Sequence, residues 1–332
     1  MPERETGIVV VTGASAGVGR ATAVAFAKLG WKVALIARGL ESIESTRREV
    51  ERAGSQAIVL PLDVADPKAV FAAADRVVAH WGRIDVWVND AMATIFAPFH
   101  DIEPEEFRRV TEVTYLGQVY GTMAALKHMR ARDHGTIVQV GSALSYRAIP
   151  LQSAYCGAKF AVRGFTDAIR SELQHEKSHV RITMMQLPAV NTPQFDWARS
   201  CLPKRLQPVP PIYQPEAIAR KIVRAARDAP RELWIGWPAL KAILGTMALP
   251  GLGDRILASE GYSGQMASES ATPGRPDNLF EPVASDPGTH GRFDDRAKDD
   301  VIGFNPTWLR AGIACVFLGL LVGAAALGHW IL

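Results

Sequence analysis

The sequence predicts an α/β fold with one doubly wound parallel sheet, followed by a C-terminal linker and one transmembrane helix. Three observations support this prediction. Short apolar, β-branched runs alternate with segments whose apolar residues recur at helical spacing, as in parallel sheets with crossover helices. A glycine-rich turn joins the first run to the first helix. An apolar stretch long enough to cross a bilayer ends the sequence.

Length and composition indicate one main domain with an appendage. The chain has 332 residues and 48% hydrophobic content, which is enough to bury a large core. We assign residues 1–245 to the main domain and residues 246–260 to a helical extension. Residues 261–306 are rich in Pro, Gly, Ser and Asp, so we expect a flexible linker there. Residues 307–332 form the predicted membrane tail.

The charge pattern and the cysteines exclude several functions. The net charge of +3 comes from scattered residues, so nucleic acid is not an expected partner. Cys156, Cys201 and Cys315 are too few and too dispersed for a disulfide framework or a zinc site. Residues 175–179 read His-Glu-x-x-His, but they fall where a helix gives way to a strand, so we expect no metal. We interpret Cys156 as a small buried residue and not as a nucleophile.

The N-terminal elements form a phosphate cradle. Residues 7–11 read as a buried strand, and residues 20–29 read as a helix. In the turn between them, Gly13 permits the tight bend, Gly17 lets the backbone approach a pyrophosphate, and Gly19 allows close helix packing. This strand, turn and helix are typical of a Rossmann-type sheet.

A second strand is predicted at residues 31–37, and it ends at Arg38. An NAD-selective fold places an acid at this position, where it binds the ribose diol. A guanidinium group suits a 2′-phosphate instead, so the sequence favours NADP(H) over NAD(H). The alternative is that Arg38 is a surface residue that starts the next helix.

Two more strands are predicted at residues 58–62 and 85–88. Between them, Asp66 is a suitable N-cap and Pro67 a suitable first residue for an amphipathic helix that runs to about residue 81. This alternation continues the pattern of a parallel sheet.

The proposed reaction chemistry centres on three side chains. Residues 136–140 read as a buried strand, so Ser142 should lie at a strand's carboxyl end, where open α/β sheets bind ligands. Tyr155 and Lys159 lie one turn apart in a helical segment, residues 155–174. An ammonium beside a phenol should lower the tyrosine pKa from about 10 toward neutrality. Such a tyrosine can exchange a proton with an alcohol or carbonyl oxygen that Ser142 holds in place.

Together these motifs resemble the short-chain dehydrogenase/reductase family of NAD(P)-dependent oxidoreductases. The resemblance covers roughly residues 6 to 240. It rests on four stretches in the family's order: Thr12 to Gly19, Asn89 to Ala91, Ser142, and Tyr155 with Lys159.

The resemblance implies a catalytic set and a cofactor site. Ser142, Tyr155 and Lys159 would be catalytic, with Thr114 in the slot of a usual asparagine. Asp63 and Val64 would contact the adenine, although Asp63 could equally be a cap, and Val190 and Thr192 would contact the nicotinamide carboxamide. The implied cofactor-binding residues are Gly13, Ser15, Gly17, Val18, Gly19, Arg38, Asp63, Val64, Asn89, Tyr155, Lys159, Val190 and Thr192.

The sequence departs from the family pattern at two places. Asp90 and Met92 stand where the family has Asn and Gly, which puts the local geometry in doubt more than the chemistry. Thr114 replaces an asparagine that helps to hold a water in the proton path. A threonine has one hydroxyl in place of an amide, so Thr114 either relays protons through a different water or is a packing residue.

The remaining elements complete the domain. Residues 180–187 and 232–236 read as strands, and residues 215–227 read as a helix. The loop at residues 194–214 is unusually apolar, so we expect it to cover a lipophilic substrate, with packing against a partner subunit as the alternative.

Residues 311–332 are a candidate membrane span, with Trp308 and Trp330 near its ends as interface anchors. The alternative is a buried C-terminal helix that folds back on the domain. No signal peptide precedes the first strand, so we expect a single-pass tail with the catalytic domain on the cytoplasmic side. Gly319 and Gly323 could bring two such helices together.

The sequence thus predicts an NADP(H)-dependent oxidoreductase that interconverts a carbonyl and an alcohol on a small lipophilic substrate. A catalytically weak NADP(H)-binding regulator on the same fold is the alternative, and an isomerase that retains its cofactor is a third hypothesis. By resemblance, we expect a homo-oligomer formed through the helices after Thr111 and Tyr155.

Overall fold

The computed structural model describes residues 6–272, 274–307 and 312. The predicted span at residues 311–332 lies outside these residues, except for Gly312. Within the described ranges, no helix is long and apolar enough to cross a membrane.

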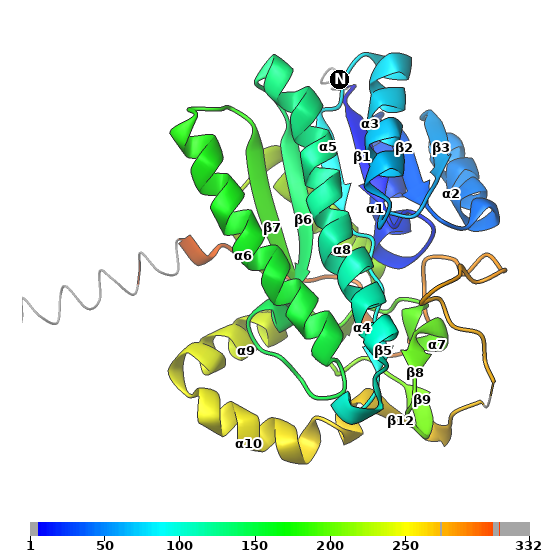
Figure 1. The fold of residues 1–332 in the computed structure, drawn as a ribbon, viewed down its shortest axis with the longest axis vertical. Helices are drawn as coiled ribbons and strands as arrows, with labels where there is room; N and C mark the ends of the chain where they lie inside the picture. The colour runs from blue at the N-terminus through cyan, green and yellow to red at the C-terminus, as the bar shows by residue number, and fades with distance from the viewer. Residues whose placement is uncertain (1–5, 273, 308–311, 313–332) are drawn as a thin grey trace, which may run out of the picture.

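A mainly parallel sheet forms the centre of the molecule (Figure 1). Its strand order is β14-β11-β7-β6-β4-β1-β2-β3, and the pairs are parallel except for β14 with β11. The chain adds β2 and β3 on one side of β1 and then adds β4 on the other side. Doubly wound sheets bind ligands at this switch point between β1 and β4. The strands are β1 (Ile8–Thr12), β2 (Lys32–Ala37), β3 (Ala57–Pro61), β4 (Val86–Asn89), β6 (Thr136–Ser142), β7 (Arg181–Leu187), β11 (Glu232–Ile235) and β14 (Gly303–Phe304). The predicted doubly wound sheet is therefore confirmed.

Helices cover both faces of the sheet. Val9 and Val11 of β1 enter one apolar cluster, and Ile8 and Val10 enter the other, because successive strand residues point to opposite faces. The first cluster includes residues of α1 (Gly17–Lys28), α2 (Leu40–Arg52) and α8 (Pro215–Asp228). The second includes residues of α3 (Pro67–Trp81), α5 (Gly117–Arg132) and α6 (Ser153–His175), the helices turned toward the viewer in Figure 1.

Local signals in the sequence set the element boundaries. The Asp66 carboxylate accepts hydrogen bonds from the N–H groups of Lys68 and Ala69, which caps α3 as predicted. The helix α1 starts at Gly17, three residues before the predicted start, because the glycine turn itself supplies its first residues. A short helix α4 (Pro104–Thr111) leads into α5 through a π-helical turn, η2 (Glu112–Leu116).

The segment after β11 differs from the sequence prediction. The extension is made of α9 (Gly236–Ala248) and α10 (Pro250–Glu260), so the predicted boundary at residue 245 falls inside a helix. The flexible linker expected at residues 261–306 is wrong. This segment adds β14 to the main sheet, pairs β12 (Met266–Ser270) with β9 (Lys204–Leu206), and pairs β13 (Ala297–Lys298) with β10 (Ile212–Tyr213).

The reason for this difference lies in three isolated apolar residues. Leu279, Phe293 and Val301 are almost completely buried, although prolines, glycines and charges surround them in the sequence. Each of them packs into an apolar cluster formed mainly by residues of the preceding domain, so composition alone does not reveal the packing.

Candidate active site

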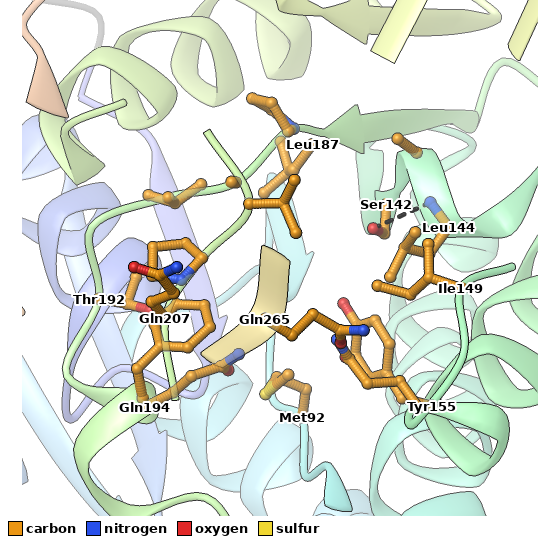
Figure 2. Close-up of a pocket in the computed structure, with 18 of the residues that line it drawn as sticks. Met92, Ser142, Leu144, Ile149, Tyr155, Leu187, Thr192, Gln194, Gln207 and Gln265 are labelled. Carbon is orange, nitrogen blue, oxygen red and sulfur yellow. Dashed lines mark hydrogen bonds between the residues drawn. The ribbon is translucent and has the colours of Figure 1, made fainter. Parts of the chain in front are cut away.

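A cavity of about 740 Å³ opens at the carboxyl ends of the central strands (Figure 2). Its lining includes Gly13 after β1, Asp90 after β4, Ser142 at the end of β6, and Pro188 after β7. These residues meet there because parallel strands end at the same edge of the sheet.

Ser142, Tyr155 and Lys159 all line this cavity, as the sequence predicts. In Figure 2 the Tyr155 hydroxyl points into the cavity toward Ser142. The Ser142 hydroxyl accepts a hydrogen bond from the N–H of Leu144 at 3.1 Å. One turn along α6 from Tyr155, the buried Lys159 donates its Nζ hydrogen bond to the carbonyl oxygen of Val140 at 2.6 Å.

The pKa of Tyr155 shifts in the opposite direction from the one expected. Burial raises the pKa of the phenol above its ordinary value, and the negative charge of Asp90 adds to the rise, while the Ser142 hydroxyl opposes it. The Nζ of Lys159 lies 5.6 Å from the Tyr155 ring centroid and donates its hydrogen bond to the Val140 carbonyl oxygen. In this structure Tyr155 therefore carries its proton at neutral pH.

Asp90 is a member of the site that the sequence reasoning missed as a chemical group. Burial raises its pKa to about 7, while the charge of Lys159 and a hydrogen bond from the Gly19 N–H lower it. Burial also lowers the pKa of Lys159 to about 8, and the charge of Asp90 opposes that change. The departure from the family's asparagine was the available signal, because it places a carboxyl group where an amide is usual.

The side chains of Thr114 and Asn89 are both hydrogen-bonded to other residues of the protein. The Thr114 hydroxyl accepts from the N–H of Ala93 at 2.9 Å and donates to the carbonyl oxygen of Ala93 at 2.7 Å. These bonds favour a structural role, as in the packing interpretation of Thr114, over the proton relay. The completely buried Asn89 amide is bonded to Trp87, Gln118, Thr122 and Gln139. The Asn89 side chain is therefore committed to the core, and the cofactor contact of Asn89 stays a prediction.

The glycine turn fits the pyrophosphate of a dinucleotide. Gly13 and Gly17 have φ angles of +72° and +53°, which side chains rarely adopt. A Cβ on Gly19 would lie 2.3 Å from the Gly13 carbonyl oxygen. Gly13, Ser15, Gly17 and Val18 line the cavity and would hold the phosphates at the start of α1.

The predicted carboxamide contacts lie beside the glycine turn. Val190 and Thr192 line the cavity, and a Cβ on Gly17 would lie 2.9 Å from Thr192 Cγ2. The structure therefore brings together the glycine turn and the segment after β7, which are distant in the sequence.

The residues predicted for the adenosine half lie outside the open cavity. Arg38 follows β2 and donates to the carbonyl oxygens of Asn278 and Phe280. Asp63 pairs with Arg109 and accepts from the N–H of Ala65, and Val64 is buried. These residues are near one another, as the sequence implies, but a later part of the chain contacts them.

The wall opposite Tyr155 is largely apolar. The loop at residues 194–214 contributes Phe195, Trp197 and Val209, and α10 contributes Ile256 and Leu257. The Gln265 amide donates to the Pro150 carbonyl oxygen at 2.9 Å and accepts from Gln152 at 2.7 Å. Residues of the 194–214 loop thus border the cavity, and the expectation that this loop covers a lipophilic substrate stays a prediction (Figure 2).

The histidine motif at residues 175–179 has no metal geometry among the described residues. His175 ends α6, whereas His179 lies beyond the helix and pairs with Asp133 at 2.6 Å. Cys156 is buried, as expected, and burial raises the pKa of its thiol to about 11.

Comparisons with known proteins agree with this geometry. The sequence profile described as short chain dehydrogenase matches residues 7–200. The chain is 34% identical over 309 residues to the uncharacterized oxidoreductase YxnA of Bacillus subtilis (strain 168), with 92% of this chain and 82% of that protein covered.

Two solved structures share the fold. The X-ray structure of an alcohol dehydrogenase from the archaeon Thermococcus sibiricus, complexed with 5-hydroxy-NADP, has a TM-score of 0.60 at 28% identity and covers 69% of this chain and 96% of that one. A metagenomic short-chain oxidoreductase in complex with NADP has a TM-score of 0.57 at 26% identity, with 68% and 92% covered. With the Ser142, Tyr155 and Lys159 geometry already described, these matches lead to one conclusion: the chain belongs to the short-chain dehydrogenase/reductase family and is an oxidoreductase.

Proposed function

We propose that this oxidoreductase interconverts a carbonyl and an alcohol with NADP(H), on a lipophilic substrate. One observation carries the proposal: Tyr155 and Ser142 point toward one another in a cavity that is bordered on one side by the glycine turn and on the other by apolar side chains. A substrate oxygen between these two hydroxyls would receive both a hydrogen bond and a proton donor.

The chain's own residues divide the work as follows. Ser142 holds the substrate oxygen, and Tyr155 gives it a proton in reduction or takes one in oxidation. The raised pKa of Tyr155 keeps the phenol protonated at neutral pH, which is the state that donates a proton in reduction. Lys159 supplies a positive charge beside the phenol and would hold the cofactor ribose. The nicotinamide, when bound, supplies the hydride.

The preference for NADP(H) follows from Arg38. Its guanidinium lies at the end of β2, where a 2′-phosphate would be recognised, and two of the similar structures are complexes with NADP or 5-hydroxy-NADP. Arg38→Asp should weaken NADPH binding and leave NADH binding equal or tighter. Arg48→Asp, on the exposed side of α2, is the control for a change of net charge. Unchanged NADPH affinity in Arg38→Asp would remove the assignment.

The lipophilic substrate class follows from the cavity wall. Leu144, Ile149, Leu187 and Phe195 line it, and the amides of Gln152, Gln207 and Gln265 are bonded to the protein. An apolar wall excludes strongly hydrated substrates because their polar groups would lose water without replacement. Equal efficiency on small polar carbonyls would contradict this proposal.

We also propose attachment to a membrane through the C-terminal tail, with the catalytic domain on the cytoplasmic side. The Trp237 and Phe304 rings lie 4.8 Å apart, which places β14 beside the start of α9. The α9–α10 segment, residues 236–260, exposes large apolar side chains, namely Trp237, Met247, Leu249, Leu252 and Ile256. Deleting residues 311–332 should release the protein from liposomes; persistent binding would refute the tail anchor.

Self-association is proposed through α5 and α6, the helices that the family resemblance implies. Met123 on α5 is 53% exposed and Phe160 on α6 is 42% exposed, so each presents apolar surface. Sedimentation should show a dimer or larger species that Phe160→Glu dissociates; a monomeric wild-type protein would contradict the proposal.

The decisive experiment measures NADPH oxidation by the full chain in detergent, with a panel of lipophilic ketones and aldehydes. Tyr155→Phe should abolish turnover while NADPH still binds. The matched control is Tyr115→Phe, because Tyr115 packs on Phe165 and does not line the cavity. Binding of NADPH with no turnover in either direction would favour a cofactor-binding regulator on the same fold.

A further inference from the structure

Residues 277–291, here called the strap, lie across the ends of β1 and β2. They belong to the segment drawn in orange below α2 in Figure 1. Arg38, which the sequence assigns to the 2′-phosphate, is bonded to this strap, and Asp63 is linked to it through Arg109.

Two arginines hold three successive carbonyl groups of the strap. Arg38 donates to the carbonyl oxygens of Asn278 and of Phe280, the latter at 2.7 Å. Arg109, which also pairs with Asp63, donates from Nε to the Leu279 carbonyl oxygen at 3.0 Å. The guanidinium proposed for the 2′-phosphate is therefore bonded to strap oxygens.

The carbonyl group of Leu279 lies between those of Asn278 and Phe280 along the strap, and its side chain packs into an apolar cluster. Leu279 has no exposed surface and belongs to the apolar cluster that contains Val64. Val64 follows Asp63, so this is the place where the family resemblance puts the adenine. Arg38, Asp63 and Val64 do not line the open cavity, whereas Asn278 does.

The strap also reaches the phosphate turn. The N–H of Gly17 donates to the Gly288 carbonyl oxygen at 3.3 Å, and the Asp286 carboxylate pairs with Arg20 of α1. Oxygen atoms and a negative charge thus lie at the start of α1, where the helix N-terminus favours anions.

We propose that the strap is a built-in occupant of the adenosine half of the cofactor site, and that NADP(H) displaces it on binding. Its carbonyl oxygens bond Arg38, Leu279 fills the adenine position, and Gly288 and Asp286 satisfy the phosphate end. The inference rests on the proposed use of NADP(H). It also links the cofactor to the substrate loop, because the Asn278 N–H donates to the Trp197 carbonyl oxygen at 3.0 Å.

Competition of this kind has a measurable consequence. The apparent dissociation constant of NADPH equals the intrinsic constant divided by the fraction of molecules whose strap is open. A change that weakens the strap without touching the cofactor residues must therefore tighten NADPH binding.

Two adjacent residues give a matched pair of variants. Leu279→Ser removes a completely buried side chain, whereas Phe280→Ser removes one that is 52% exposed. By NADPH titration of the full chain, Leu279→Ser should bind NADPH roughly tenfold more tightly or better. Phe280→Ser should stay within about twofold of the wild type, since its side chain adds little to strap packing.

Hydrogen exchange of the wild-type protein gives a second readout that does not depend on any variant. The strap amides, including those of Asn278 and Gly291, should be protected without NADPH and should exchange faster when it is bound. Increased protection on binding would overturn the proposal, because the strap would then be a cover over the cofactor. Equal or weaker affinity in Leu279→Ser would also overturn it.

The failure of the proposed function would look different. If neither NADPH nor NADH bound to the wild type or to Leu279→Ser, the cofactor assignment and the strap proposal would both fall. If NADPH bound to the wild type but the strap amides were unprotected beforehand, only the strap proposal would fall.

Discussion

Replacing Gly19 by alanine should destabilise the protein and weaken cofactor binding, because the site has no room for one more carbon. A Cβ at this position would lie 2.3 Å from the Gly13 carbonyl oxygen and 2.9 Å from an Asp90 carboxylate oxygen. The first of these atoms is backbone of the glycine turn, so relief of the clash must move the turn itself.

The magnitude follows from two opposing effects. Overpacking of this kind costs about 1–3 kcal/mol. Alanine in a helix gains about 1 kcal/mol over glycine, which offsets part of that cost. The net loss of about 1 kcal/mol corresponds to a decrease in Tm of roughly 2–4 °C. The displaced turn should also lose about tenfold in NADPH affinity for each 1.4 kcal/mol.

The assay is thermal unfolding with and without NADPH, and Gly164→Ala is the matched control. Gly164 lies in α6 with nothing within 4 Å of its potential Cβ. The same substitution should therefore raise the Tm by roughly 2–4 °C, through helix propensity alone. If Gly19→Ala unfolded at the wild-type temperature and bound NADPH equally well, the close approach of the turn to α1 would be refuted.

Three further predictions concern single side chains. Asp90→Asn removes a negative charge that raises the pKa values of Tyr155 and Lys159. The parts of the pH profile of kcat/KM that report these two groups should therefore move to lower pH. An unchanged pH profile would contradict the coupling. Thr114→Val should lower the free energy of unfolding by about 1–3 kcal/mol, because it leaves the buried Ala93 backbone groups unpaired. Thr114→Ser keeps the hydroxyl and should keep the wild-type stability. A kinetic change without a stability change would favour the relay. His290 pairs with Glu216 and Asp294, and these carboxylates raise its pKa although burial opposes the rise. The contribution of His290 to stability is therefore complete below the unfolded-state pKa, and it is lost as pH rises through the folded-state pKa. His290→Gln should flatten that part of the stability curve in chemical denaturation at different pH values, and an identical curve would rule the pairing out.

The pH dependence of His290 has a definite sign. The folded state binds the proton more tightly than the unfolded state does, so protonation favours folding. The expected loss therefore lies at and above the ordinary histidine pKa, and not in acid.

Local rules of the chain account for the elements that the sequence predicts correctly. Strand β1 alternates its side chains between two faces, Asp66 caps α3, and Tyr155 and Lys159 share a face of α6. Each of these features depends on residues within a few positions of one another, through periods of about 2 and 3.6 residues. The glycine turn is equally local, since its φ angles and its position between a strand and a helix are both encoded in one short stretch.

The pKa shift of Tyr155 and the hydrogen-bond partners of Asn89 could not be predicted from the local sequence. Proximity in a helix suggested that Lys159 would lower the pKa of Tyr155, but burial dominates and raises it. The commitment of Asn89 to the core depends on Gln118, Thr122 and Gln139, which come from other elements. Such effects depend on how much water each group loses on folding, and that is a property of the assembled fold.

The sequence by itself determined the parallel sheet, the glycine turn and the three side chains, Ser142, Tyr155 and Lys159, that meet in the cavity, because each is specified by short-range pattern. Only the tertiary structure decided the course of residues 277–291, which composition describes as a linker. A single buried leucine and a few carbonyl groups hold this strap on Arg38, Arg109 and Gly17. These contacts join residues that are distant in the chain, and the surface that receives Leu279 exists only after the sheet and its helices have packed.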